Sequence, residues 1–282
     1  MKWMIATDSS CDLMTLDTGS PEIDFGTVPF SLILDDQEYQ DNDALRVPEL
    51  VDKMESAASS HSACPSPSDW EELFLQADQV IAFTISGQLS GSYNSAQTGK
   101  TMALEKDPDK KIEIIDSRAT GPKLVLLVQR ALRAIQGGAS FEDVCSVCRK
   151  LADNGRTVFT LSSFHNLIQN GRVNKFAGVL AGKLGIRVIG VGSPEGEIQL
   201  KDLIRGEQRT LKRVVKDMVE NGYNGSEMAI SHCLNESMAL SLREMILAHW
   251  ADAKVQILPT RGLDSYYAER SGLIVCYPTA AV

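Results

Sequence analysis

The sequence is poor in aromatic residues and histidines, and it has no long apolar run. Aromatic residues make up 6% of its 282 residues, and there are four histidines. No stretch reaches the roughly 20 consecutive apolar residues that a membrane helix needs, and the N-terminal segment MKWMIATDSSCDL has no apolar core long enough for a signal peptide. We therefore expect a cytoplasmic protein without integral membrane association.

Basic residues are also fewer than acidic ones. The chain carries 28 Lys and Arg against 37 Asp and Glu, for a formal charge of −9 at pH 7. This balance argues against nucleic acid or an acidic membrane surface as a partner. An anionic ligand would have to be bound by local donors, and the length allows two ordinary domains to supply them.

The common catalytic motifs are missing. The residues around Ser90 lack the G-x-S-x-G spacing of a hydrolase elbow, and neither a Walker loop nor a G-x-G-x-x-G after the first strand is present. No H-x-x-H or HExxH pair occurs, so no metal is expected. An acyl hydrolase or transferase using Ser90 with His232 stays open as an alternative, although a lone histidine at a strand end is more often structural.

Strand-like and helix-like segments alternate along the chain, which predicts an α/β fold with mainly parallel sheets flanked by helices. The expected strands are residues 3–7, 28–34, 80–85, 112–116, 157–161, 186–192, 227–231, 255–259 and 273–277. The clearest expected helices start near Val47, Pro122, Glu207 and Glu236. The segment GVGSPEGEIQL predicts a hairpin, which adds an antiparallel element to the second half.

The polar segment DNGR (153–156) is the expected domain boundary. It divides the chain into an N-terminal α/β domain, residues 1–155, and a C-terminal α/β domain, residues 156–282, that closes a ligand cleft against it.

Hydroxyl-bearing residues follow three of the expected strands, in TDSS (7–10), SGQLSGS (86–92) and DSRATG (116–121). Because ligands bind beyond the carboxyl ends of parallel strands, these loops are expected to converge on one site. A fourth such segment, HSACPSPSDW (61–70), could instead be a loop that ends in a helix cap at Ser66 or Ser68. So many hydroxyls and glycines indicate a surface of donors for an anion.

The order of these motifs resembles the DegV family of bacterial fatty-acid-binding proteins. The resemblance is carried by ATDSSCDL, SACPS, ISGQLSGSYNSA, IIDSRATG, LIQNGRVNK and the region from Gly196 to Val214. It implies a two-domain DegV-like fold, also called the EDD fold, that holds one long-chain fatty acid in an apolar tunnel. It also implies a carrier without a cofactor, which in some members presents the fatty acid to a separate kinase that forms an acyl phosphate.

The same resemblance implies the ligand-binding residues. Ser62 and Ser90 fall on the family positions whose hydroxyls bind the carboxylate, and Gly91 and Ser92 would add backbone amides. The family's C-terminal histidine is absent from residues 259–277, where Arg261, Ser265 or a tyrosine could replace it. Arg261 is the attractive candidate because a guanidinium pairs bidentately with a carboxylate.

Two questions stay open at the sequence level. The changed C-terminal segment leaves room for a different amphipathic acid as the ligand. Arg172, Arg205 and Arg209 are possible contacts for a kinase, but exposed arginines near helix starts are usually solvated, and that interpretation is favoured.

Overall fold

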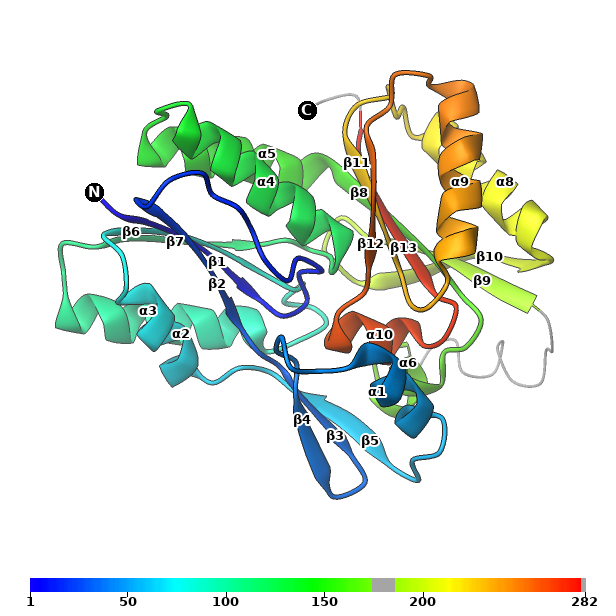
Figure 1. Cartoon of the computed structure of the whole chain (residues 1–282), viewed down its shortest axis with the longest axis horizontal. Helices are drawn as coiled ribbons and strands as arrows, with labels where there is room; N and C mark the ends of the chain where they lie inside the picture. Colours follow the sequence, from blue (N-terminus) through cyan, green and yellow to red (C-terminus); the bar gives the residue numbers. More distant parts are fainter. Residues whose placement is uncertain (174–185, 280–282) are drawn as a thin grey trace.

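The computed structural model describes residues 1–173 and 186–279 of the chain, which form two large sheets, one small sheet and the helices that flank them (Figure 1). The first large sheet has the order β2-β1-β6-β7, with all strands parallel. Its strands are β1 (Trp3–Asp8), β2 (Ile23–Val28), β6 (Gln79–Thr84) and β7 (Lys111–Asp116).

Helices cover both faces of this sheet, which is why the central strand β6 is buried at every residue. Two helices lie on one face, α2 (Pro67–Phe74) and α3 (Ser92–Lys106), and two on the other, α4 (Pro122–Gln136) and α5 (Phe141–Asn154) (Figure 1). Helix α2 begins at a capping box in which Ser66 and Asp69 exchange hydrogen bonds, so the expected cap at Ser66 is confirmed.

The segment expected to form one strand over residues 28–34 is split between two sheets. Strand β2 ends at Val28, and β3 (Ser31–Leu34) starts a separate antiparallel sheet of order β4-β3-β5. Pro29 lies at the break, where it has no amide hydrogen to donate to a ladder. The other two strands are β4 (Gln37–Gln40) and β5 (Ser60–Ala63), and β5 places Ser62 opposite Leu32.

The second large sheet has the order β10-β9-β8-β13-β11-β12, and only β11 and β12 pair in parallel. Its strands are β8 (Gly155–Leu161), β9 (Ile186–Gly192), β10 (Ile198–Arg205), β11 (Met228–His232), β12 (Val255–Pro259) and β13 (Leu273–Pro278). The α/β class and the β9–β10 hairpin are confirmed, and antiparallel pairing extends beyond that hairpin.

The outer face of the second sheet is covered by α8 (Glu207–Glu220) and α9 (Glu236–His249) (Figure 1). Three shorter helices, α1 (Val47–Met54), α6 (His165–Gln169) and α10 (Gly262–Ala268), lie between the small sheet and the second large sheet (Figure 1). No described helix is both long enough and apolar enough to cross a membrane.

Helix α4 packs between the two large sheets. Its leucine and valine side chains share one apolar core with Phe83 of β6, Ala229 of β11 and Cys276 of β13. Burial of this kind stabilises by about 25 cal/mol per Å² of apolar surface removed from water, so α4 holds the halves of the chain together. The expected boundary at residue 155 coincides with the start of β8, and the division into two domains stays a prediction.

Candidate functional site

The loops after β1, β6 and β7 converge, as their positions at the carboxyl ends of neighbouring strands predict. Asp8, at the end of β1, is the centre of this convergence. Its carboxylate accepts hydrogen bonds from the hydroxyl of Ser10 at 2.5 Å, the hydroxyl of Ser92 at 2.6 Å and the backbone amide of Ile85 at 3.0 Å. Burial raises the pKa of Asp8, and these hydrogen bonds act in the opposite direction. The hydroxyls of Ser10 and Ser92 therefore bind an internal carboxylate rather than a ligand.

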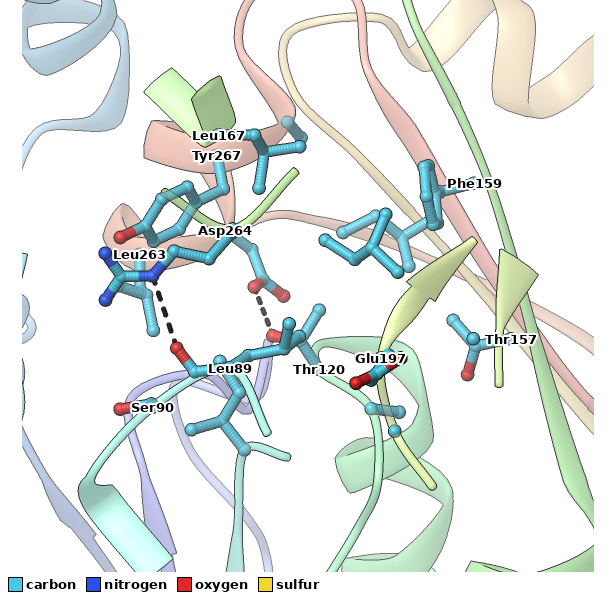
Figure 2. Close-up of a pocket in the computed structure, with 18 of the residues that line it drawn as sticks. Leu89, Ser90, Thr120, Thr157, Phe159, Leu167, Glu197, Leu263, Asp264 and Tyr267 are labelled. Carbon is cyan, nitrogen blue, oxygen red and sulfur yellow. Dashed lines mark hydrogen bonds between the residues drawn. The ribbon is translucent and has the colours of Figure 1, made fainter. Parts of the chain in front are cut away.

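Beside these loops lies a cavity with about 830 Å³ of empty space, some of it open to solvent. Most of its wall is apolar and comes from both halves of the chain (Figure 2). The apolar wall residues are Phe30, Ile85, Leu89, Ala119, Phe159, Leu161, Leu167, Ile198, Leu263, Ala268 and Ile274. An elongated apolar group can therefore be removed from water here.

One end of the cavity is polar. Ser62, Ser90, Arg172 and Tyr267 all line it, and the Ser62 and Tyr267 hydroxyl oxygens lie 2.8 Å apart. The Arg172 guanidinium donates to the Leu89 carbonyl at 3.3 Å, the contact drawn in Figure 2, and lies 5.8 Å from the centre of the Tyr267 ring. Burial raises the pKa of Tyr267, so its phenol stays protonated and can donate.

The local structure leaves the Ser90 hydroxyl available. Residues 86–90 form a turn in which the amides of Leu89 and Ser90 donate to the carbonyl of Ser86 at 3.0 and 3.1 Å. The Ser90 oxygen accepts one hydrogen bond, from the amide of Ser92 at 3.3 Å. Its own proton can therefore point into the cavity toward an acceptor.

Two of the five expected ligand-binding residues, Ser62 and Ser90, line the cavity, whereas Gly91, Ser92 and Arg261 are not part of its wall. Gly91 precedes the first residue of α3, and the amide and hydroxyl of Ser92 are used by Ser90 and Asp8. Direct contacts of these three residues with a ligand stay predictions.

Arg261 is buried between the two halves of the chain. It donates to the carbonyls of Leu13 and Asp41, both at 3.0 Å, and it lies 3.9 Å from the Asp41 carboxylate. Of the other expected substitutes for the missing histidine, Ser265 is bonded to Thr260 at 2.7 Å, and Tyr267 reaches the cavity. Of these candidates Tyr267 alone lines the cavity, and its contact with a ligand stays a prediction.

The sequence interpretation missed several polar residues of the cavity wall: Arg172, Thr120, Asp264 and Glu197. Arg172 was expected to be solvated, but it is half-buried at the polar end. Its place inside the LIQNGRVNK segment, which carries part of the family resemblance, could have indicated that Arg172 belongs to the site. Residues 174 and 175 of that segment lie outside the described residues.

The turn between β9 and β10 closes the wall of the cavity on the side of Glu197. The Ser86 hydroxyl donates to the carbonyl of Gly196 at 2.8 Å, and Arg118 donates to the carbonyl of Pro194 at 3.4 Å. Gly196 has a φ of +95°, and a Cβ there would lie 2.2 Å from the Ser86 hydroxyl. Glycine is therefore needed for this close approach.

His232 does not join Ser90 at the cavity. Its ring nitrogen Nδ1 accepts a hydrogen bond from the amide of Asn235 at 3.2 Å, and its side chain is not part of the cavity wall. Burial lowers the pKa of His232. The structure thus brings together no Ser90–His232 pair of the kind that the hydrolase alternative requires. Within residues 1–173 and 186–279, no cluster of three or more Asp, Glu, His or Cys side chains could hold a metal ion.

The two-sheet fold and its apolar cavity with hydroxyls at one end define an α/β protein with space suited to an amphipathic ligand. The family model described as "Uncharacterised protein, DegV family" matches residues 2–268. The chain belongs to the DegV family, and the resemblance drawn from the sequence motifs is confirmed.

Individual relatives match over nearly the full chain. A DegV domain-containing protein of Streptococcus gordonii is 34% identical over 98% of this chain and 99% of its own length. The crystal structure of the Streptococcus pneumoniae fatty acid kinase (Fak) B3 protein loaded with linoleic acid is similar with a TM-score of 0.95, at 36% identity and 99% coverage of both chains. A DegV family protein from Eubacterium eligens loaded with heptadecanoic acid has a TM-score of 0.93 and 32% identity, covering 98% of this chain and 99% of its own.

Proposed function

We propose that this protein binds one long-chain fatty acid, with the carboxylate at Ser62 and Ser90 and the tail in the apolar cavity. The observation that carries this assignment is the cavity in which an apolar wall ends at Ser62, Ser90, Tyr267 and Arg172. The similar proteins from S. pneumoniae and E. eligens, which are described as loaded with linoleic and heptadecanoic acid, support it.

The energetics match this ligand class. Each methylene group moved from water into the cavity contributes about 0.8 kcal/mol, so a long chain supplies most of the affinity. A carboxylate taken out of water has to be satisfied by donors, and hydrogen bonds to a charged group contribute on the order of 1.5–3 kcal/mol each. The hydroxyls of Ser62, Ser90 and Tyr267, with the Arg172 guanidinium nearby, can supply these donors.

The protein acts as a carrier that presents the fatty acid carboxylate to a partner kinase in the cytoplasm. The half-buried positions of Ser62 and Ser90 support a carboxylate at the more accessible end of the cavity. The similarity to the Fak B3 protein supports such a partner, and the absence of a Ser90–His232 pair disfavours hydrolysis.

Native mass spectrometry of the purified protein, before and after solvent extraction, tests the proposal. We expect about one fatty acid per chain, and its return to the extracted protein raises the melting temperature because it binds only the folded state. Absence of stoichiometric lipid together with an unchanged melting temperature refutes the proposal. Recovery of a different amphipathic acid changes the ligand class. Acyl ester or thioester hydrolysis that disappears in Ser90→Ala would establish an enzyme instead.

A further inference from the structure

Two buried carboxyl groups, those of Asp12 and of the cavity-wall residue Asp264, each have one oxygen without a hydrogen-bond partner among the described residues. Asp12 follows β1, and its Oδ1 accepts from the amide of Arg261 at 2.8 Å. Asp264 lies in α10, and its Oδ1 accepts from the Thr120 hydroxyl, a contact drawn in Figure 2. The other oxygens of the two carboxyl groups, Asp12 Oδ2 and Asp264 Oδ2, are buried and have no hydrogen-bond partner within residues 1–173 and 186–279. Both residues are at most 3% exposed.

These two oxygens converge on the same point of the structure. Gly121 precedes α4 with a φ of +59°, and a Cβ at Gly121 would lie 2.4 Å from Asp264 Oδ2 and 2.8 Å from Asp12 Oδ2. The free oxygens of Asp12 and Asp264 therefore lie close to each other beside the backbone of Gly121. Two ionised carboxylates this close would repel strongly in a buried site, whereas one proton bound by the pair removes one of the two negative charges.

The surrounding charges do not remove this repulsion. The titratable or charged groups around the pair are Asp8 at the end of β1, Cys11 in the same loop, Asp41 after β4, Arg261 before α10 and Cys233 after β11. The Arg261 guanidinium supplies positive charge, but it lies against Asp41 at 3.9 Å. Burial raises the pKa of Asp12 to about 7; the nearby Ser231 hydroxyl and the Arg261 amide act to lower it, and the charge of Asp41 acts to raise it. Burial and the charge of Asp12 raise the pKa of Asp264 well above its ordinary value.

We propose that Asp12 and Asp264 share one proton, and that this shared proton fastens α10 to the loop after β1. Helix α10 also carries Leu263 and Tyr267, which line the cavity, so the proton holds one wall of the cavity in place. The link depends on pH, because loss of the proton leaves two buried carboxylates close to each other.

The direction of the pH effect follows from proton counting. In the unfolded chain both carboxyl groups release their protons near pH 4, whereas the folded protein keeps the shared proton up to neutral pH. The folded state then binds about one more proton, so its stability falls as the pH rises from about 4 through 7. One proton corresponds to a tenfold change in the unfolding equilibrium constant for each pH unit.

The test compares the pH dependence of unfolding in wild type and Asp264→Asn, both freed of lipid. The amide that this substitution introduces would donate to Asp12 without needing a shared proton. Between pH 5 and 7 the unfolding constant of wild type should rise up to tenfold for each pH unit, and that of the variant should lack this rise. Asp12→Asn should also lack this rise, because its amide would donate to Asp264. Asp252→Asn, at an exposed carboxyl outside the cluster, should keep the wild-type slope. Contributions from histidines cancel in these comparisons.

A wild-type slope in both Asp264→Asn and Asp12→Asn would overturn the shared proton. If neither variant folds, calorimetric unfolding of His232→Gln in buffers of different ionisation enthalpy counts the protons directly. His232 has to be replaced because burial lowers its pKa, so in wild type it takes up a proton on unfolding and masks a release. Release of about one proton per chain from this variant near pH 6 supports the proposal, and release of none refutes it. These measurements use lipid-free protein, so their outcome is independent of whether the cavity binds a fatty acid.

Discussion

The hydroxyl oxygens of Ser62 and Tyr267 lie 2.8 Å apart although 205 residues separate them in sequence. Ser62 belongs to β5 of the small sheet, and Tyr267 belongs to α10, which packs beside it. The contact therefore joins the N-terminal and C-terminal parts of the chain at the polar end of the cavity. We expect the Tyr267 hydroxyl to be a third donor to a ligand carboxylate, beside those of Ser62 and Ser90.

Removing the Ser90 hydroxyl should weaken fatty acid binding. Ser90→Ala leaves a ligand carboxylate short of one donor, which costs roughly 1–3 kcal/mol. Ser62→Ala should act similarly, and the double variant should lose less than the sum because both hydroxyls serve one anion. Isothermal titration with a fatty acid and with its methyl ester measures the loss and its dependence on charge.

Ser68→Ala is the matched control for these two variants, because Ser68 is exposed on α2 and is not part of the cavity wall. It should bind like wild type. If wild type binds the acid and the methyl ester equally well, the two serines have no role in charge recognition.

Tyr267→Phe should reduce affinity for the fatty acid while keeping the fold. The phenylalanine ring can fill the same space, and the variant loses only the hydroxyl that contacts Ser62. A hydrogen bond contributes about 1 kcal/mol net, so affinity should fall about fivefold. Competition with a fluorescent fatty acid measures this change. An unchanged affinity would mean that the Tyr267 hydroxyl only supports Ser62 in the unliganded protein.

A methyl group at Gly196 should loosen the β9–β10 turn that closes the cavity. Gly196→Ala brings a Cβ to 2.2 Å from the Ser86 hydroxyl and 3.0 Å from the Cα of Arg118, in addition to the backbone strain of a positive φ. Gly138→Ala has the same kind of φ, +75°, but nothing within 4 Å, so it isolates the strain. Backbone strain of this kind costs of order 1–3 kcal/mol in both variants. Gly196→Ala should lower the melting temperature more than Gly138→Ala does, because it adds the close contacts. Equal melting temperatures would show that the turn does not need this close contact.

Asp217 of α8, which binds side chains of the second large sheet, should make the free energy of unfolding depend on pH in the acid range. Burial alone would raise its pKa, but hydrogen bonds from Arg156, Lys201 and Tyr277 lower it to about 2. A folded-state pKa below the unfolded value gives stability that is present above pH 4 and is lost as the pH falls toward 2. Asp217→Asn should remove this dependence and destabilise by about 3 kcal/mol, the low end for a broken buried pair, because Arg156 and Lys201 keep some contact with water. Urea unfolding at pH 3 and pH 7 measures both effects.

Sequence patterns predicted the elements that are long or buried on both faces. Helix α4 runs from Pro122 to Gln136 as expected, because a proline in the first turn and glycines after the last fix its ends. Strand β6 was also predicted, since its apolar run is continuous. Strand β4 (Gln37–Gln40) was missed because its residues are mostly polar and exposed, so they carry no periodic pattern.

The candidate site was predictable only where local sequence determines it. Ser62 and Ser90 lie in segments rich in turn and hydroxyl residues, and both reach the cavity. The surroundings of Arg261 and Arg172 could not be predicted: Arg261 is buried in contacts with backbone carbonyls, so its contact with a ligand stays a prediction, and Arg172 lines the polar end. Such differences arise from packing between segments far apart in sequence, which spacing alone cannot reveal.

The cavity wall includes residues from Phe30 near the beginning of the chain to Ile274 near its end. During synthesis on the ribosome, domains form progressively from the N-terminus, and β13, which carries Ile274, emerges long after Phe30. A nascent chain therefore exposes the apolar residues of an incomplete wall until β13 has been made. A lipid can be enclosed only after this strand has joined the second sheet.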